Sequence, residues 1–152
     1  MASTALLQWE IDLPLTALAD QIGMPDARRA YLRSRAAVDA LKQIVAEEGI
    51  RCGLEDKDTL YLAGDEYGRR ALEAEAEARA DIGLDSTFLG PADLRERFGL
   101  DRTGAILSTG SASADPAQLA AGLLRRAQAD GAVVYSPVEV VQAASDPDGV
   151  TL

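Results

Sequence analysis

The sequence predicts an α+β fold, in which helices pack on a small mixed or antiparallel sheet. Residues 27–48 place apolar side chains along one helical face, whereas 59–63 and 132–135 are short runs of β-branched, aromatic and aliphatic residues typical of strands. Glycines and prolines separate these segments at short intervals. The chain has 152 residues, which is enough for one domain of ordinary size with a buried core.

The first segment, 3–22, has a helical pattern. Apolar residues recur along one face at steps of three or four, at Leu7, Ile11, Leu15, Leu18 and Ile22. Pro14 interrupts the pattern, because proline removes a helical hydrogen bond and clashes with the preceding turn. We therefore expect two short helices here, the second capped by Asp12. The long helix at 27–48 follows and ends at Gly49.

The middle of the chain predicts a hairpin followed by a helix. Residues 50–54 and 59–63 have the composition of strands, and the polar residues 55–58 between them predict a turn. A helix rich in alanine and glutamate is then expected from Asp65 to Ile82, ending at Gly83. Its apolar stripe is thin, so most of its carboxylates are expected to face solvent.

The second half alternates short strands and helices. A strand at 87–89, a helix from Pro91 to Phe98, a strand at 104–109 and a loop of small residues at 110–114 are expected. The pair Asp115-Pro116 predicts a capped helix start rather than a phosphate-binding loop, since no Gly-Lys-Ser/Thr follows.

The helix after Asp115 is expected to end at Gly131. Two strands, 132–135 and 138–141, and a tight turn at 146–149 follow. A further strand begins at Val150 and stops at Leu152, which suggests a truncated protein. Unpaired edges on the strands at Val133 and Val140 predict self-association.

The composition excludes several classes of function. The net charge of −10 disfavours nucleic acid and anionic membranes as partners, and suits a cytoplasmic protein. The sequence contains no histidine and one cysteine, Cys52, so no metal site is expected and a Ser-His-Asp or Cys-His mechanism cannot be built. Cys52 is expected to be a small buried residue without a base to activate it.

Few residues are candidates for chemistry. Tyr61 points away from the face that carries Leu60 and Leu62, so it either faces a ligand cavity or packs, and packing is favoured. Glu73 and Glu77, one turn apart, are expected to be solvated. Glu75 and Arg79 form an i,i+4 pair worth a few tenths of a kcal/mol. From the residues alone, no catalytic site is defined.

Four stretches together resemble the FAD-dependent oxidoreductases of the D-amino-acid oxidase and glycine oxidase kind. They are residues 3–12, residues 49–63, Gly110-Ser111-Ala112 with Asp115-Pro116 and Leu119-Ala120, and residues 131–140. Each stretch is loosely defined, but their order and spacing agree with that family. The resemblance implies an incomplete part of an FAD/NAD(P)-binding plus substrate-domain fold, with 1–109 the helical and substrate-side region and 110–152 returning to the FAD-binding domain.

The resemblance also implies site residues. Ser3 and Thr4 are expected near the flavin or its phosphates, Val140 near the adenine, and Tyr61 on the substrate side. No G-x-G-x-x-G follows a strand, so FAD binding by this chain is expected to be weak or absent. The catalytic residues stay unknown, and in this family the flavin carries most of the chemistry.

Two functions follow as expectations. The first is an internal fragment of an FAD-dependent oxidoreductase that acts on a small-molecule substrate, an amine, an amino acid or a related compound, the fragment itself being inactive. The alternative is a self-contained, non-catalytic binding or assembly module, which the acidic, histidine-free composition supports.

Overall fold

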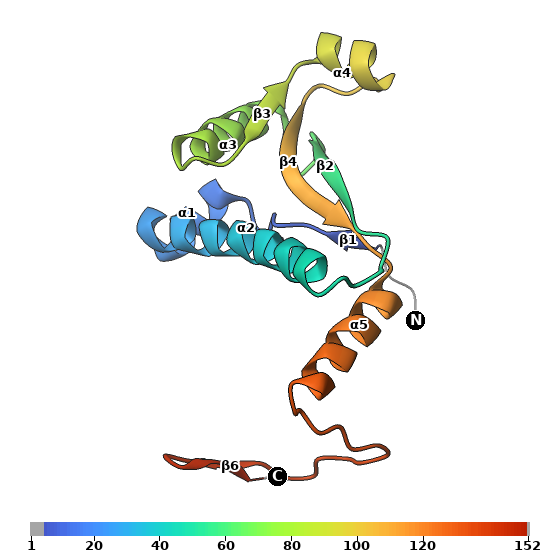
Figure 1. Cartoon of the computed structure of the whole chain (residues 1–152). Coiled ribbons are helices and arrows are strands. Elements are labelled where there is room, and N and C mark those ends of the chain that lie inside the picture. Colours follow the sequence, from blue (N-terminus) through green and yellow to red (C-terminus); the bar gives the residue numbers. More distant parts are fainter. Residues whose placement is uncertain (1–4, 152) are drawn as a thin grey trace.

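The structure is a computed structural model and describes residues 5–151 (Figure 1). Its α+β class confirms the predicted class. The elements in chain order are β1 (Leu6–Leu7), α1 (Leu15–Ile22), α2 (Met24–Glu47), β2 (Glu55–Leu62), α3 (Arg69–Asp81), β3 (Ser86–Leu89), α4 (Pro91–Phe98), β4 (Ala105–Ser113), α5 (Pro116–Ala129), β5 (Ala144–Asp146) and β6 (Gly149–Thr151).

The longest strand, β4, organises the main sheet, and every pairing in it is antiparallel. β2 lies along one edge of β4 over most of its length, with Tyr61 opposite Ile106. β1 and β3 share the other edge, where Leu6 is opposite Ser113 and Leu89 is opposite Ala105. β4 thus brings β1 close to β2, although β4 follows β1 by about a hundred residues of sequence.

A β-bulge bends β4 where it crosses from β3 to β1. Lys57 of β2 is opposite Ser111, but Thr59 is opposite Ser108, so one residue of β2 faces two residues of β4. Gly110 lies at this point with φ 88°, which is the left-handed region that glycine adopts without strain. Across the bulge, β4 stays paired with β2 on one edge, while β3 and β1 pair with the two ends of its other edge.

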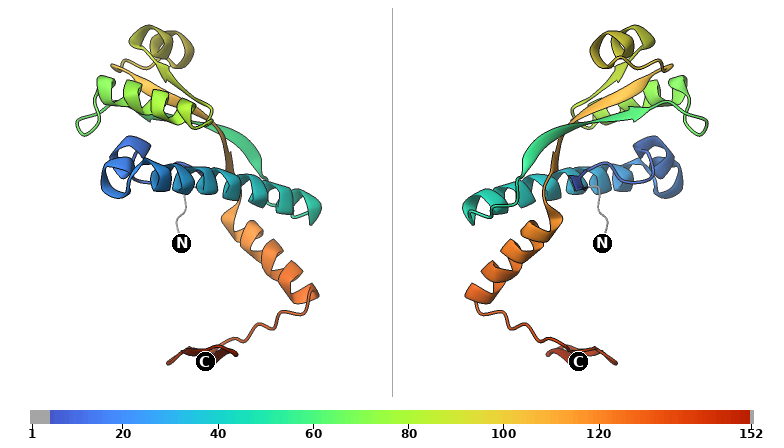
Figure 2. Two further views of the ribbon diagram at one scale, coloured as in Figure 1. Left: turned by 90° about the vertical axis from the view of Figure 1, so that its left-hand side faces the viewer. Right: turned by 90° about the vertical axis from the view of Figure 1, so that its right-hand side faces the viewer.

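Helices cover the sheet and enclose the core (Figures 1 and 2). α1 packs on α2 and on α3, and α3 in turn packs on β3 and β4. Trp9, Leu15 and Tyr31 are completely buried in the cluster between β1, α1 and α2. A separate cluster of Leu72, Ala76 and Ile106 joins α3 to β4.

The predicted helices are largely confirmed, because their ends are fixed by local signals. Gly49, Gly83 and Gly99 all have positive φ and follow α2, α3 and α4 closely. Asp115 caps α5 as expected, since its Oδ1 accepts hydrogen bonds from the backbone N–H of Ala117 at 2.9 Å and Gln118 at 3.0 Å. These bonds hold the pKa of the Asp115 carboxyl below its usual range.

The helix predicted before Pro14 and the cap predicted at Asp12 are wrong. Residues 6–7 form a strand, and the chain is irregular until α1 begins after Pro14. Pro14 therefore starts a helix instead of interrupting one, and its backbone C=O accepts from Leu18 at 2.8 Å. Pairing with β4 overrides the local helical period, which a sequence pattern does not reveal.

The predicted hairpin at 50–63 and the loop at 110–114 are also wrong. Residues 50–54 are irregular, and the polar residues 55–58 are the first half of β2. β2 pairs with β4, not with residues 50–54. The small residues Gly110 to Ser113 continue β4, because β1 and β2 hydrogen-bond to both of its edges there. β4 is thus continuous across residue 110, and the domain boundary placed there stays a prediction.

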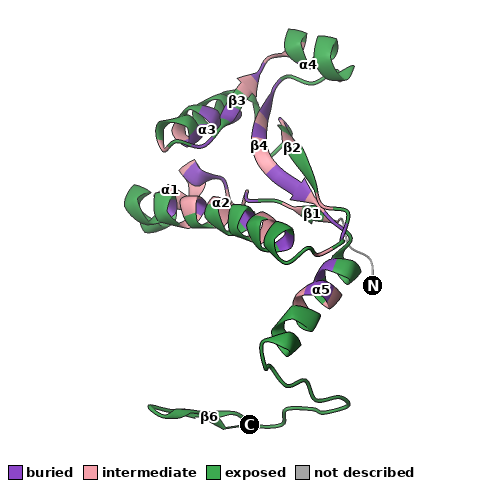
Figure 3. Ribbon diagram, in the orientation of Figure 1, coloured by how far each residue is buried: buried purple, intermediate pink, exposed green. Residues whose placement is uncertain are grey.

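The strands predicted at 132–135 and 138–141 are absent from the structure of residues 5–151. Both segments are irregular and exposed, and no neighbouring strand pairs with them (Figure 3). The turn at 146–149 is confirmed, and it joins β5 to β6 in a small hairpin that is exposed throughout. Self-association through edges at Val133 and Val140 stays a prediction, without the strands on which it was based.

Candidate functional site

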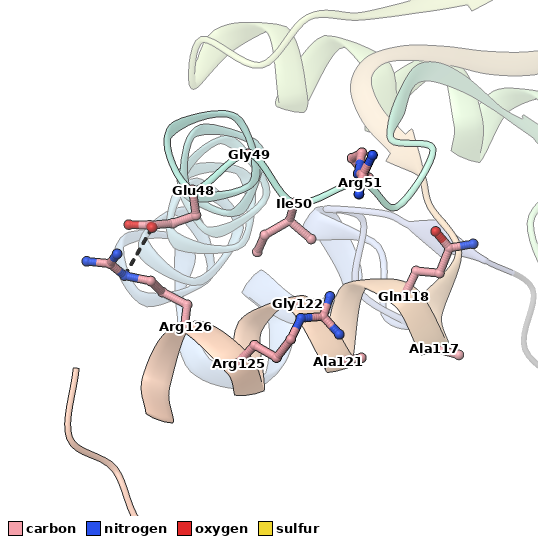
Figure 4. A pocket seen from close by; sticks show the side chains of 10 residues that line it. All are labelled: Glu48, Gly49, Ile50, Arg51, Ala117, Gln118, Ala121, Gly122, Arg125 and Arg126. Atoms are coloured by element: carbon pink, nitrogen blue, oxygen red, sulfur yellow. Dashed lines mark ion pairs between the residues drawn. The ribbon is translucent and has the colours of Figure 1, made fainter. Parts of the chain in front are cut away.

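Several cavities of ligand size lie among the described residues, with volumes from about 370 to about 890 Å³. A groove of about 890 Å³, called here the α2–α5 groove, lies between the loop after α2 and the first turns of α5 (Figure 4). Its ends carry exposed arginines, and Arg126 Nε lies 3.0 Å from Glu48 Oε2. None of the side chains lining it contains a buried polar atom that lacks a partner. A second cavity, lined by a buried ion pair, is the better candidate for function.

This second cavity, called here the β1–β2 cavity, has a volume of about 470 Å³. It lies between the segment that follows β1, the second half of β2 and one side chain of α3. The lining residues are Leu6, Gln8, Glu10, Ile11, Asp12, Pro14, Asp58, Thr59, Leu60, Tyr61 and Arg79. The pairing of β1 and β2 with the same strand, β4, is what positions these segments together.

Arg79 is the buried cation of the β1–β2 cavity, with 3% of its side chain exposed. Its Nε donates to Glu75 Oε1 at 2.7 Å, one turn back along α3. Its guanidinium also lies 5.6 Å from the ring centre of Trp9 and 5.5 Å from that of Tyr31. Ion pairing and two aromatic faces therefore hold this side chain in one place.

Glu10 lies beside Arg79 and is 13% exposed. Its Oε1 accepts a short hydrogen bond from Thr59 Oγ1 of β2 and lies 3.9 Å from Arg79 Nη1. The remaining atoms of the pair, Glu10 Oε2 and Arg79 Nη1, are buried without a hydrogen-bond partner among the described residues. An acceptor and a donor are thus left unsatisfied inside the protein, which costs free energy.

Tyr61 lines the same cavity, at 39% exposed. The strand alternation predicted for it is confirmed, since Leu60 and Leu62 pack into the cluster around Leu89 on the other face. Partial burial, with Tyr67 and Glu66 nearby, raises the pKa of the Tyr61 phenol. Its hydroxyl therefore stays protonated at neutral pH and is available as a donor. Its role towards a substrate stays a prediction.

Sequence reasoning paired Arg79 with Glu75 but missed the burial of that pair and the second acidic partner, Glu10. Glu73 and Glu77 are exposed as expected, but Glu75 is buried together with Arg79, so their pair is not a solvated surface pair. The signal was present in the spacing. Glu75 and Arg79 lie three and seven residues after Leu72, on the face that α3 buries.

Of the other predicted site residues, Val140 is described, and it does not line the cavity. Ser3 and Thr4 lie outside the described residues. Val140 is exposed in the irregular segment after α5, and its contact with an adenine stays a prediction. Cys52 is buried between α2 and α5, as expected for a small apolar side chain.

The arrangement favours recognition of a small polar molecule. Within residues 5–151 no group of three or more His, Cys, Asp or Glu side chains is placed to hold a metal ion. The same residues contain no helix with the length and hydrophobicity needed to cross a bilayer. What the cavity does offer is the exposed carboxylates of Asp12 and Asp58 and an aromatic hydroxyl, with the buried Glu10–Arg79 pair behind its wall.

Comparisons with known proteins find similarity over almost the whole chain. The family model named DAO, FAD dependent oxidoreductase, matches residues 3–152. The fold is similar to glycine oxidase from Geobacillus kaustophilus, with a TM-score of 0.69 and 25% sequence identity over 97% of this chain and 39% of that one. It is also similar to glycine oxidase from Bacillus cereus ATCC 14579, with a TM-score of 0.57 and 19% identity over 97% of this chain and 41% of that one.

No curated protein matches the sequence significantly. The chain spans about two-fifths of the length of the glycine oxidases that it resembles.

Proposed function

Because the chain belongs to the DAO family of FAD-dependent oxidoreductases, we propose that it is part of an enzyme that oxidises an amine, an amino acid or a related substrate by hydride transfer to the flavin. The family match over residues 3–152 is the observation that carries this proposal. The likeness to a glycine oxidase fold along 97% of the chain supports it. An acidic chain with one cysteine also supports a cytoplasmic location.

Within such an enzyme, this chain contributes the substrate side. The β1–β2 cavity supports that role, because it combines polar groups with the apolar side chains of Leu6 and Ile11. Its volume of about 470 Å³ suits a small molecule. Arg79 and Glu10 form a buried ion pair behind the wall, and Tyr61, at 39% exposure, forms part of the wall itself.

The residues of this chain alone do not fit a complete FAD site. The sequence contains no G-x-G-x-x-G, which in dinucleotide-binding folds lets the backbone approach the pyrophosphate. The β1–β2 cavity carries the carboxylates of Glu10, Asp12 and Asp58, which repel phosphates. We therefore assign no step of the flavin chemistry to these residues, and we expect the isolated chain to bind FAD weakly or not at all and to be inactive.

Absorbance spectroscopy tests both halves of the proposal. The purified chain should carry far less than one flavin per molecule, and a stoichiometry near one would contradict the expected weak binding. A longer protein containing these residues should be yellow. Its flavin absorbance should bleach when a substrate amine or amino acid is added without oxygen. A flavin that stays oxidised across a broad panel of amines and amino acids would exclude the proposed reaction.

A non-catalytic assembly role is the second candidate. One observation favours it, since the irregular segment after α5 exposes several large apolar side chains: Val133 at 70%, Tyr135 at 75%, Val138 at 69% and Val141 at 91%. Such a surface is typical of a segment that contacts another part of a protein or a second copy. Light scattering at high concentration would detect self-association, and a clean monomer would count against it.

A further inference from the structure

The α2–α5 groove carries positive charge in an otherwise acidic protein. The chain as a whole has 25 acidic and 15 basic residues, whereas three arginines and one glutamate line this groove. They are Arg51 on the loop after α2, Arg125 and Arg126 on α5, and Glu48 at the end of α2. A cleft lined mainly by one sign of charge concentrates ions of the opposite sign. The groove therefore attracts an anion.

Two of the three arginines have no acidic partner. Arg126 is neutralised, because its guanidinium lies 3.0 Å from Glu48 Oε2 and 3.1 Å from Asp130 Oδ1. Arg51 and Arg125 are exposed, and neither forms an ion pair with any residue that the structure describes. The charges of these two guanidinium groups are thus free to act on a ligand.

The two free arginines stand on different walls of the groove (Figure 4). Arg51 lies on the loop that carries Ile50, and Arg125 lies on the helix that carries Gly122. These walls are in tight contact at their base, since a Cβ atom at position 122 would overlap the side chain of Ile50. The spacing of the walls is therefore fixed by packing, and an anion in the groove has an arginine on either side.

The start of α5 does not supply the anion site. Asp115 already accepts hydrogen bonds from the backbone N–H groups of Ala117 and Gln118, so a carboxylate of the chain itself occupies these donors. The arginine side chains are left as the groups that recognise the anion. A guanidinium donates two parallel hydrogen bonds to one oxyanion, which makes arginine suited to carboxylate and phosphate groups.

The number of free arginines distinguishes between these two anions. A carboxylate has one charge and two oxygens, which match one guanidinium. A phosphate group carries up to about two negative charges at neutral pH and at least three acceptor oxygens, which match two guanidinium groups. Ile50 and Ala121 add apolar surface, and the volume of about 890 Å³ leaves room for an organic group attached to the phosphate.

We propose that the α2–α5 groove binds a phosphate group between Arg51 and Arg125. This site is separate from the β1–β2 cavity, since the two share no lining residue. Its ligand is therefore a second molecule, distinct from the amine or amino acid of the proposed function. The phosphate is either the free ion or part of a phosphorylated small molecule.

Phosphorus-31 NMR tests the binding directly. Addition of the chain at low ionic strength should shift or broaden the resonance of inorganic phosphate in a saturable way, with one site per chain and a dissociation constant of about 1 mM or lower. AMP identifies what carries the group. Binding of AMP about tenfold tighter than that of phosphate indicates a phosphorylated molecule, and equal or weaker binding indicates the free ion. Adenosine lacks the phosphate and should not displace AMP.

Variants connect the binding to the two side chains. Arg51→Gln and Arg125→Gln should each weaken phosphate binding about tenfold or more, because each removes charge-assisted hydrogen bonds. Arg125→Lys keeps the charge but loses the forked donor, and its affinity should lie between those of the parent and Arg125→Gln. Arg28→Gln is the matched control, since Arg28 is also exposed and unpaired but lies on α2 outside the groove. Circular dichroism checks that each variant is folded.

Two results would overturn the phosphate site. The first is the absence of saturable binding for both phosphate and AMP. The second is equal weakening by Arg28→Gln and Arg125→Gln, because the anion would then respond to the overall charge of the chain instead of the groove. Displacement of AMP by adenosine would likewise show that the phosphate is not the group recognised. The proposed oxidation is tested apart from these results, since neither arginine lines the β1–β2 cavity.

Discussion

Glu75 of α3 accepts a hydrogen bond from the backbone N–H of Leu15 at 2.7 Å, across 60 residues of sequence. Its second oxygen accepts from the backbone N–H of Thr16 at 2.8 Å. These two donors belong to the first turn of α1, which has no side-chain cap of its own. Glu75 therefore acts as a cap supplied by another helix, and the same carboxylate holds Arg79 at the β1–β2 cavity.

The first prediction concerns this carboxylate. Glu75→Ala should lower the free energy of unfolding by about 3–5 kcal/mol, because it leaves the buried Arg79 without its partner and the start of α1 without its cap. Urea denaturation followed by circular dichroism measures the change. Glu73→Ala on the exposed face of α3 is the matched control and should cost less than about 0.5 kcal/mol. A loss below about 1 kcal/mol for Glu75→Ala would contradict the capping role.

The buried phenol of Tyr31 leads us to expect that the protein loses stability in alkali. Its hydroxyl donates to the backbone C=O of Leu13 at 2.9 Å, and burial raises the pKa of the phenol above its ordinary value of 10.0. Because the pKa of Tyr31 is higher in the folded state than in the unfolded state, its protonated phenol contributes to the free energy of unfolding. This contribution is fully present below pH 10. That stability declines as the pH rises from about 10 towards the folded-state pKa.

Tyr31→Phe isolates this contribution. At pH 7 the variant should lose about 1 kcal/mol of unfolding free energy, since the hydrogen bond to Leu13 is gone. Above pH 10 its unfolding free energy should fall less steeply with pH than that of the parent chain. Tyr135→Phe, at a side chain that is 75% exposed, is the control and should leave the pH profile unchanged. Parallel profiles for Tyr31→Phe and the parent would refute the assignment.

Elements defined by contacts between residues close in sequence were predicted correctly, and those defined by contacts between distant residues were not. Gly99 ends α4 and Asp115 begins α5 through contacts within a few residues, so local patterns predict both. The partner of Thr59 on β4 lies 49 residues away at Ser108, and no local pattern indicates which strand that partner belongs to. The predicted hairpin failed because it assumed that neighbouring strand-like segments pair with each other.

The candidate site was predicted less well than the fold for the same reason. Tyr61 was placed on the correct face of β2 by strand alternation alone. Glu10 and Arg79 were not brought together, because Glu10 follows β1, Arg79 lies on α3, and both β1 and α3 contact β4, which comes later in the chain. Glu75 was treated as one half of a weak i,i+4 pair with Arg79, although its spacing from Leu72 placed it on the buried face of α3.

A glycine controls how α5 packs on the loop after α2. Gly122 of α5 is buried, and a Cβ atom at this position would overlap Cγ2 of Ile50. Alanine at position 122 improves the intrinsic helix propensity by about 1 kcal/mol. Overpacking costs about 1–3 kcal/mol, so we expect Gly122→Ala to be destabilising overall.

A double-mutant cycle with Ile50→Ala tests this packing. In the Ile50→Ala background the space is free, so Gly122→Ala should be neutral or stabilising, and the two changes should couple by more than about 0.5 kcal/mol. Thermal unfolding monitored by circular dichroism at α-helical wavelengths measures all four proteins. Additive effects would show that Ile50 moves away without cost, and the glycine would then have no packing role.

The last prediction concerns the segment after α5. Residues 132–151 are all exposed, and their strands β5 and β6 pair only with each other among the described residues. Deletion of 132–152 should therefore leave the midpoint of thermal unfolding within about 2 °C, because no buried apolar area is lost. Deletion from residue 115 onwards is the contrasting variant. It removes the buried side chain of Leu119 and should lower the midpoint clearly. If the shorter deletion alone is strongly destabilising, the exposed valines of this segment make contacts in solution, and the assembly role gains support over a free segment.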